Sequence, residues 1–99
     1  MVIKIPATAG SLESSDAMIT IKPNEEGGIV LDLQSSVEKQ YGQQIKDVIM
    51  ETLHNFEVEK AIVSIVDKGA LDCTLKARME TAIYRASQNT EYRWAGEPR

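Results

Sequence analysis

The chain has 99 residues, 42% of them hydrophobic, and a formal net charge of -4 at pH 7. This length allows one domain with a modest core and leaves little room for a deep active-site cleft. The mild acidity, without a dense lysine or arginine cluster, argues against nucleic-acid binding. The single cysteine excludes an internal disulfide. No apolar run reaches membrane-spanning length, and the apolar stretch at the N-terminus is too short for a signal peptide, so we expect a cytoplasmic protein.

The first fifteen residues join an apolar tip to a stretch of small and polar residues, and we expect a flexible, irregular or loosely strand-like segment. Ser11, Ser14 and Ser15 lie in it among small residues. A serine hydroxyl is a poor nucleophile without a base, and none is near in the sequence. These serines therefore indicate either acceptors for another enzyme or a plain serine-rich lead-in to a strand, and composition alone favours the lead-in.

Two strands are predicted next. Residues 17–22 place Ile19 and Ile21 on one face, and residues 29–34 alternate apolar and polar side chains. Between them, residues 23–28 contain proline, asparagine and two glycines, which is a strong turn signal. The sequence therefore predicts that the two strands form a hairpin.

Residues 37–55 are predicted to form the first helix. Ser35 and Glu38 have the spacing of a capping box at its start, and Gly42 indicates close packing on a sheet. His54 lies near the helix end, where the dipole stabilises a partly charged imidazole; with no partner nucleophile, it is interpreted as structural. Apolar residues recur through this region at helical spacing: Val37, Tyr41, Ile45, Val48, Ile49, Leu53 and Phe56.

The remaining elements are a strand and a second helix. Residues 60–66 are nearly all apolar and β-branched, which favours a central strand or one buried on both sides. Residues 70–88 are predicted to form a helix, and residues 89–99 a frayed tail whose Tyr92 and Trp94 either cover the sheet or face a partner. The predicted inward face of the second helix contains Leu71, Leu75, Met79, Ala82, Ile83 and Ala86.

The order β-β-α-β-α predicts an α+β two-layer sandwich, with both helices on one face of a small mixed sheet. The first helix permits a parallel pairing of the strands on either side of it. The whole chain, residues 1–99, is expected to form one domain.

Candidate chemistry outside the serines is sparse. Asp67 and Asp72 flank the start of the second helix, where one can cap or flank it and the other interacts with its dipole. Cys73 is either a thiol activated by that dipole or a small buried side chain, and burial is favoured. One histidine and one cysteine lack the spacing of a metal site.

Several strings occur in a fixed order: Ala9-Gly10 followed by Leu12-Glu13-Ser14-Ser15-Asp16, then Ser35-Ser36-Val37-Glu38-Lys39-Gln40-Tyr41-Gly42, then Asp67-Lys68-Gly69-Ala70-Leu71-Asp72-Cys73, and finally Ala77-Arg78 with Arg85-Ala86-Ser87. In a chain of this size they resemble the acyl carrier protein, or gamma chain, of citrate lyase. The resemblance implies a non-catalytic subunit of a lyase complex. It is carried by most of the chain, from the serine segment to the second helix.

The resemblance also implies a covalent phosphoribosyl-dephospho-coenzyme A arm on the serine after Leu-Glu, which is Ser14, with the adjacent Ser15 as second choice. The arm's thiol would hold acetyl and citryl groups while citrate is cleaved to acetate and oxaloacetate. The implied partners are the alpha (acyl transferase) and beta (citryl lyase) subunits, the prosthetic-group transferase and the acetylating ligase. Ser11 lacks the preceding aspartate of phosphopantetheine carriers and is not assigned the arm.

Two other interpretations stay open. The carrier subunit of malonate decarboxylase resembles the same family and uses the same arm, although the Leu-Glu-Ser-Ser-Asp string favours citrate lyase. An unmodified small α+β interaction domain would carry no adduct and would not depend on Ser14.

Overall fold

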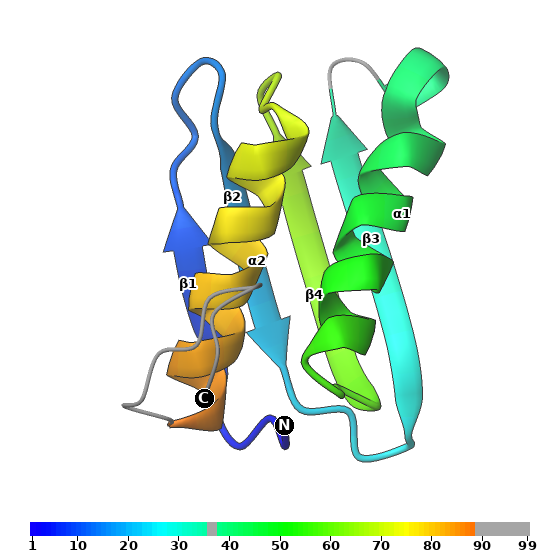
Figure 1. Cartoon of the computed structure of the whole chain (residues 1–99), viewed down its shortest axis with the longest axis vertical. Helices are drawn as coiled ribbons and strands as arrows, with labels where there is room; N and C mark the ends of the chain where they lie inside the picture. The colour runs from blue at the N-terminus through cyan, green and yellow to red at the C-terminus, as the bar shows by residue number, and fades with distance from the viewer. Residues whose placement is uncertain (36–37, 89–99) are drawn as a thin grey trace.

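A computed structural model describes residues 1–35 and 38–88 of the chain. The elements in order are β1 (Ala7–Gly10), β2 (Ala17–Lys22), β3 (Gly28–Ser35), α1 (Glu38–Asn55), β4 (Lys60–Asp67) and α2 (Asp72–Ser87). Both helices lie side by side over one face of a single four-stranded sheet (Figure 1). The predicted two-layer α+β sandwich and its β-β-α-β-α order are confirmed, with one additional strand at the N-terminus. The expected capping box includes residues 36–37, and the expected tail is residues 89–99, so neither prediction falls within the described residues.

The strands lie in the order β1-β2-β4-β3. β1 pairs with β2, and β2 with β4, in antiparallel fashion, whereas β3 and β4 are parallel on either side of the α1 crossover. The predicted hairpin of β2 and β3 is therefore wrong, because β4 lies between them. The turn signal at residues 23–28 was correct, with positive φ at Gly27 and Gly28. The apolar β4 gains more burial as a central strand than at an edge, and a local turn pattern does not reveal that insertion.

The N-terminal segment contains a short strand that pairs with β2. Residues 7–10 pair with β2 in a fixed register, Ala7 opposite Ile21 and Gly10 opposite Met18. Before them, the N–H groups of Lys4 and Ile5 donate to the carbonyl of Ala86 at the end of α2, at 2.9 and 3.1 Å. Residues 7–10 thus follow the strand-like alternative of the expectation for this segment, and the flexibility of residues 1–15 stays a prediction.

The core lies between the sheet and the two helices. Its largest fully buried apolar side chains are Tyr84, Ile19, Ile21, Ile49, Leu53, Ile65, Leu75, Met79, Ile83 and Val63. The predicted inward face of α2 is confirmed from Leu75 onward, but Leu71 is 70% exposed because it precedes the first turn of that helix. On α1, Tyr41 is 51% exposed and does not join the core. Within the described ranges, neither helix is long and apolar enough to cross a membrane.

Candidate functional site

The three serines lie on the loop that joins β1 to β2, residues 11–16, hereafter the serine loop. The Asp16 N–H donates to the Glu13 carbonyl at 3.1 Å, which closes a four-residue turn with Ser14 and Ser15 at its two central positions. Ser15 has φ of 65°, whereas Ser14 has negative φ. A positive φ at the second central residue is the pattern of a type II turn. The turn therefore places Ser14 at a corner of the chain, and its side chain is exposed.

The hydroxyls of Ser11 and Ser14 have different surroundings. The Ser11 hydroxyl donates to Asp16 Oδ2 at 2.6 Å and accepts from the Glu13 N–H at 3.3 Å. Ser15 is held through its backbone, since its N–H donates to the Lys68 carbonyl at 2.8 Å. The Ser14 hydroxyl has no hydrogen-bond partner among residues 1–35 and 41–88. Of the two, only the Ser14 hydroxyl could thus react without breaking a bond within the described part of the loop.

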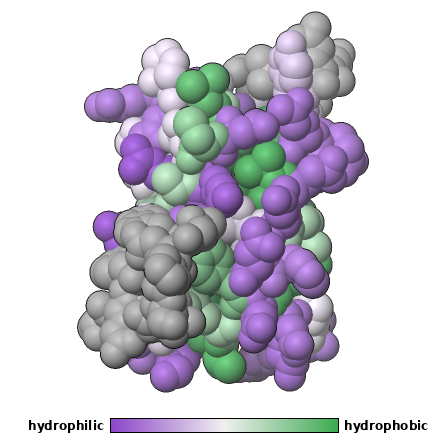
Figure 2. Space-filling model, in the orientation of Figure 1, coloured by the Kyte–Doolittle hydropathy of each residue, from purple (hydrophilic) through white to green (hydrophobic). Residues whose placement is uncertain are grey.

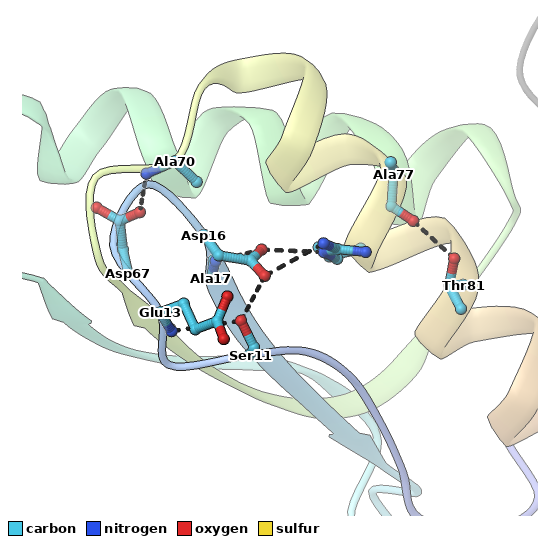
Figure 3. Close-up of polar contacts among 9 residues, drawn as sticks. Ser11, Glu13, Asp16, Ala17, Asp67, Ala70, Ala77 and Thr81 are labelled. Atoms are coloured by element: carbon cyan, nitrogen blue, oxygen red, sulfur yellow. Dashed lines mark hydrogen bonds and ion pairs between the residues drawn. The ribbon is translucent and has the colours of Figure 1, made fainter.

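Asp16 holds the end of the serine loop against α2. Arg78 donates through Nε to Asp16 Oδ1 at 3.0 Å and through its terminal nitrogen to Oδ2 at 3.2 Å, a two-point pairing of a guanidinium with a carboxylate (Figure 3). The Ala17 N–H donates to Oδ1 at 2.7 Å, and the Asp16 side chain is only 14% exposed. Arg78, then the Ser11 hydroxyl and the Ala17 N–H, stabilise the charged form and hold the pKa of Asp16 well below its usual range.

We expect this network to give stability that depends on pH. The pKa of Asp16 is lower in the folded protein than in the unfolded chain. The charged carboxylate therefore contributes its full stabilisation of the fold above the ordinary aspartate pKa of about 3.9, and this stabilisation is lost as pH falls through the folded pKa. Asp16→Asn should lower the melting temperature at pH 7, and the gap to wild type should narrow below about pH 4. Asp32→Asn, at an exposed aspartate of β3, is the control. A gap that stays constant from pH 7 to pH 2 would contradict this role.

A second loop supports the serine loop from the other side. The Lys68 N–H donates to the Asp16 carbonyl at 2.9 Å, which complements the bond from Ser15 to Lys68. Lys68 belongs to the β4–α2 loop, residues 68–71. The buried Asp67 fixes this loop: its Oδ1 accepts from the Ala70 N–H and its Oδ2 from the Ser35 hydroxyl, both at 2.9 Å. Gly69 makes the turn at φ of 90°.

The other candidate residues do not gather at the serine loop. His54 is exposed in the last turn of α1, at the opposite end of the sheet (Figure 1). Asp72 lies in the first turn of α2, as predicted for an aspartate that interacts with the helix dipole. Cys73 is exposed, so the favoured prediction of a buried side chain is wrong: the buried face of α2 starts only at Leu75. Within the described ranges, no three metal-ligating side chains lie together.

Sequence reasoning singled out Ser14 but missed the residues that hold its loop. Arg78 and Asp16 are 62 positions apart, so no local pattern links them. Gly10, at φ of 92°, was noted only as part of a family string. Its added Cβ would lie 1.8 Å from the Ala17 carbonyl oxygen, a close approach across the base of the loop. A glycine directly before a loop of small residues was the one available signal.

Amide hydrogen exchange can test how much of the serine loop moves. The N–H groups of Ser15 and Asp16 are hydrogen-bonded to backbone carbonyls, whereas those of Leu12 and Ser14 have no acceptor among the described residues. We expect Leu12 and Ser14 to exchange rapidly and Ser15 and Asp16 more slowly. Strong protection across all residues from 10 to 15 would contradict a mobile, accessible corner.

Three comparisons with known proteins agree on the type of protein. Residues 4–86 match the family model of an acyl carrier described as malonate decarboxylase delta subunit (MdcD). A citrate lyase acyl carrier protein of Streptococcus mutans is 58% identical, over 95% of this chain and 92% of its own length. One from Fusobacterium nucleatum is 49% identical, over 95% and 100%. The fold is similar to a chain in the crystal structure of a Pseudomonas malonate decarboxylase hetero-tetramer in complex with malonate, with a TM-score of 0.69, 18% identity, and coverage of 85% and 86%.

Proposed function

Because this chain belongs to the family of citrate lyase acyl carrier proteins, we propose that it carries acyl groups as a non-catalytic subunit of a citrate lyase. Sequence identity of 58% and 49% to two citrate lyase acyl carrier proteins, each over 95% of this chain, supports a citrate lyase carrier over a malonate decarboxylase carrier. The likeness to the decarboxylase chain, at 18% identity, supports the fold alone. The site agrees with a carrier: Asp16, the carboxylate that accepts from the Ser11 hydroxyl, is paired with Arg78, which holds the pKa of Asp16 well below its usual range and makes it a poor general base.

Ser14 is proposed as the attachment point of a covalent phosphoribosyl-dephospho-coenzyme A arm. The observation that carries this choice is the exposed Ser14 hydroxyl at the corner of the turn, without a partner among the described residues. Ser11 uses its hydroxyl to hold Asp16, and Ser15 is held at a positive φ. The loop thus fits a bulky modification at Ser14, which would point into solvent rather than into the core.

The chain's own residues serve to present that anchor. Asp16 and Arg78 fix the exit of the loop on α2, and the bonds to Lys68 fix it on the β4–α2 loop. The arm, once attached, supplies a thiol that carries acetyl and citryl groups. A fixed anchor with a long arm keeps the acyl group at high effective concentration for the active sites of other subunits. The proposed partners are the alpha and beta subunits, the prosthetic-group transferase and the acetylating ligase, in the cytoplasm.

Intact mass of the protein from its native host tests the proposal. A carrier is expected to show a mass increase equal to the arm, mapped to the peptide with Ser14. Protein made together with the attachment enzymes, assembled with its partner subunits, should support cleavage of citrate and not decarboxylation of malonate. Decarboxylation of malonate without cleavage of citrate would favour the carrier subunit of a malonate decarboxylase. A bare mass from the native host would favour an unmodified interaction domain.

A further inference from the structure

The β4–α2 loop, which holds the serine loop, also lines a second feature. It is a groove of about 650 Å³ between α1 and the beginning of α2, hereafter the groove. Tyr41, Gln44 and Ile45 line it on the α1 side, and Gly69, Leu71 and Cys73 line it on the other side. Its volume is in the range of small-molecule pockets, about 300–1,000 Å³. Figure 2 shows hydrophobic surface at the beginning of α2 and again between the helices, flanked by hydrophilic side chains.

The groove exposes apolar side chains that the fold leaves uncovered. Leu71 is 70% exposed and Tyr41 is 51% exposed, and neither takes part in the core. At its rim, Gln44 donates through Nε2 to both carboxylate oxygens of Asp72, at 3.2 and 3.0 Å. This pair joins α1 to α2 across the groove. An apolar lining with a few fixed polar groups is typical of a ligand site.

The groove and the serine loop both adjoin Lys68. Lys68 exchanges backbone bonds with Ser15 and Asp16 of the serine loop, and the next residue, Gly69, lines the groove. The serine loop, the β4–α2 loop and the beginning of α1 all lie at one end of the sheet (Figure 1). A flexible arm anchored on Ser14 therefore starts at the same end of the sheet as this groove.

We infer that the groove is a resting site for the uncharged end of the chain's own arm, its thiol and the acetyl group bound to it. The inference rests on the proposed function and extends it. Charge favours this end: the exposed carboxylate among the described lining residues is Asp72 and none of them is basic, so the free carboxylates of a citryl group are disfavoured there relative to an uncharged acetyl group. The groove would thus shelter the acetyl form and leave the citryl form free for the partner subunit.

Tethering makes weak binding sufficient. A flexible linker gives an effective concentration of about a millimolar, so a contact with Kd in that range keeps the groove about half occupied. A partner protein is a poorer occupant, because a specific protein interface buries roughly 1,200–2,000 Å² and this is a small hollow. A resting position of this strength would still release the acyl group for reaction.

Cys73 provides a direct measurement. It is the only cysteine of the chain, it is exposed, and it lines the groove. In the acetylated carrier the arm's thiol is blocked, so iodoacetamide labels Cys73 alone. We expect labelling to be at least about twofold slower in the acetylated carrier than in Ser14→Ala, which carries no arm. Leu71→Glu, which adds charge to the groove, should remove most of this difference. Val30→Glu, at a half-exposed residue of β3 away from the groove, should preserve it.

Three outcomes would overturn the inference. Equal labelling of Cys73 with and without the arm, in protein whose mass confirms the arm, refutes the resting site and leaves the proposed function intact. Slow labelling that appears only when partner subunits are added to unmodified protein assigns the groove to a subunit contact. An unmodified mass after production with the attachment enzymes refutes the proposed function, and the resting site with it.

Discussion

Ser14→Ala is expected to abolish attachment of the arm, and with it citrate cleavage by the assembled complex. The change removes the oxygen that would form the bond to the arm, so the loss should be complete rather than partial. Folding should be nearly unaffected, within about 0.5 kcal/mol, because the side chain is exposed and its hydroxyl has no partner among the described residues. Peptide mapping after production with the attachment enzymes measures the adduct, and urea denaturation measures stability.

Two neighbouring serines provide matched controls. Ser15→Gly keeps the turn, since glycine adopts the φ of 65° without strain, and should retain the adduct. Ser11→Ala removes the hydroxyl that holds Asp16 and should retain the adduct with some loss of stability. An adduct that persists in Ser14→Ala and vanishes in Ser15→Gly would move the anchor by one residue. An adduct in all three variants would exclude the serine loop as the anchor.

The elements were predictable where the pattern was local. The helical spacing of Ile45, Ile49 and Leu53 identified α1. The β-branched run at residues 60–66 indicated a central strand or one buried on both sides, and β4 is a central strand. The partner of each strand was less predictable. β2 and β3 are joined by a turn but separated by β4, because burial of β4 on the sheet outweighs the proximity of the two strands in sequence.

The candidate site shows the same limit. The serine string could be recognised from adjacent residues, but the groups that hold it come from distant elements, namely Arg78 of α2 and Lys68 after β4. Cys73 was misassigned because helical spacing alone does not reveal where the buried face of a helix begins. Contacts that close long loops depend on packing and hydrogen-bond geometry, which periodicity does not encode.

Gly10→Ala is expected to lower the free energy of unfolding more than an alanine substitution at another glycine with positive φ, such as Gly28. Gly10 ends β1 at φ of 92°, where an alanine would cost about 1–3 kcal/mol in backbone strain alone. An added Cβ would also lie 1.8 Å from the Ala17 carbonyl oxygen and 3.2 Å from the Arg78 side chain. Backbone must shift to relieve the first contact, so we expect a loss of more than about 4 kcal/mol in the free energy of unfolding.

Gly28→Ala separates strain from close contact. Gly28 also has positive φ, 82°, but an added Cβ would meet nothing within 4 Å. Its cost should be limited to strain, about 1–3 kcal/mol. Urea denaturation of both variants should therefore give a clear difference, with Gly10→Ala the less stable. Because the shift would fall at the base of the serine loop, Gly10→Ala should also slow attachment at Ser14 under conditions where the variant remains folded. Equal losses in the two variants would mean that β1 and β2 do not approach as closely at Gly10 as the structure indicates.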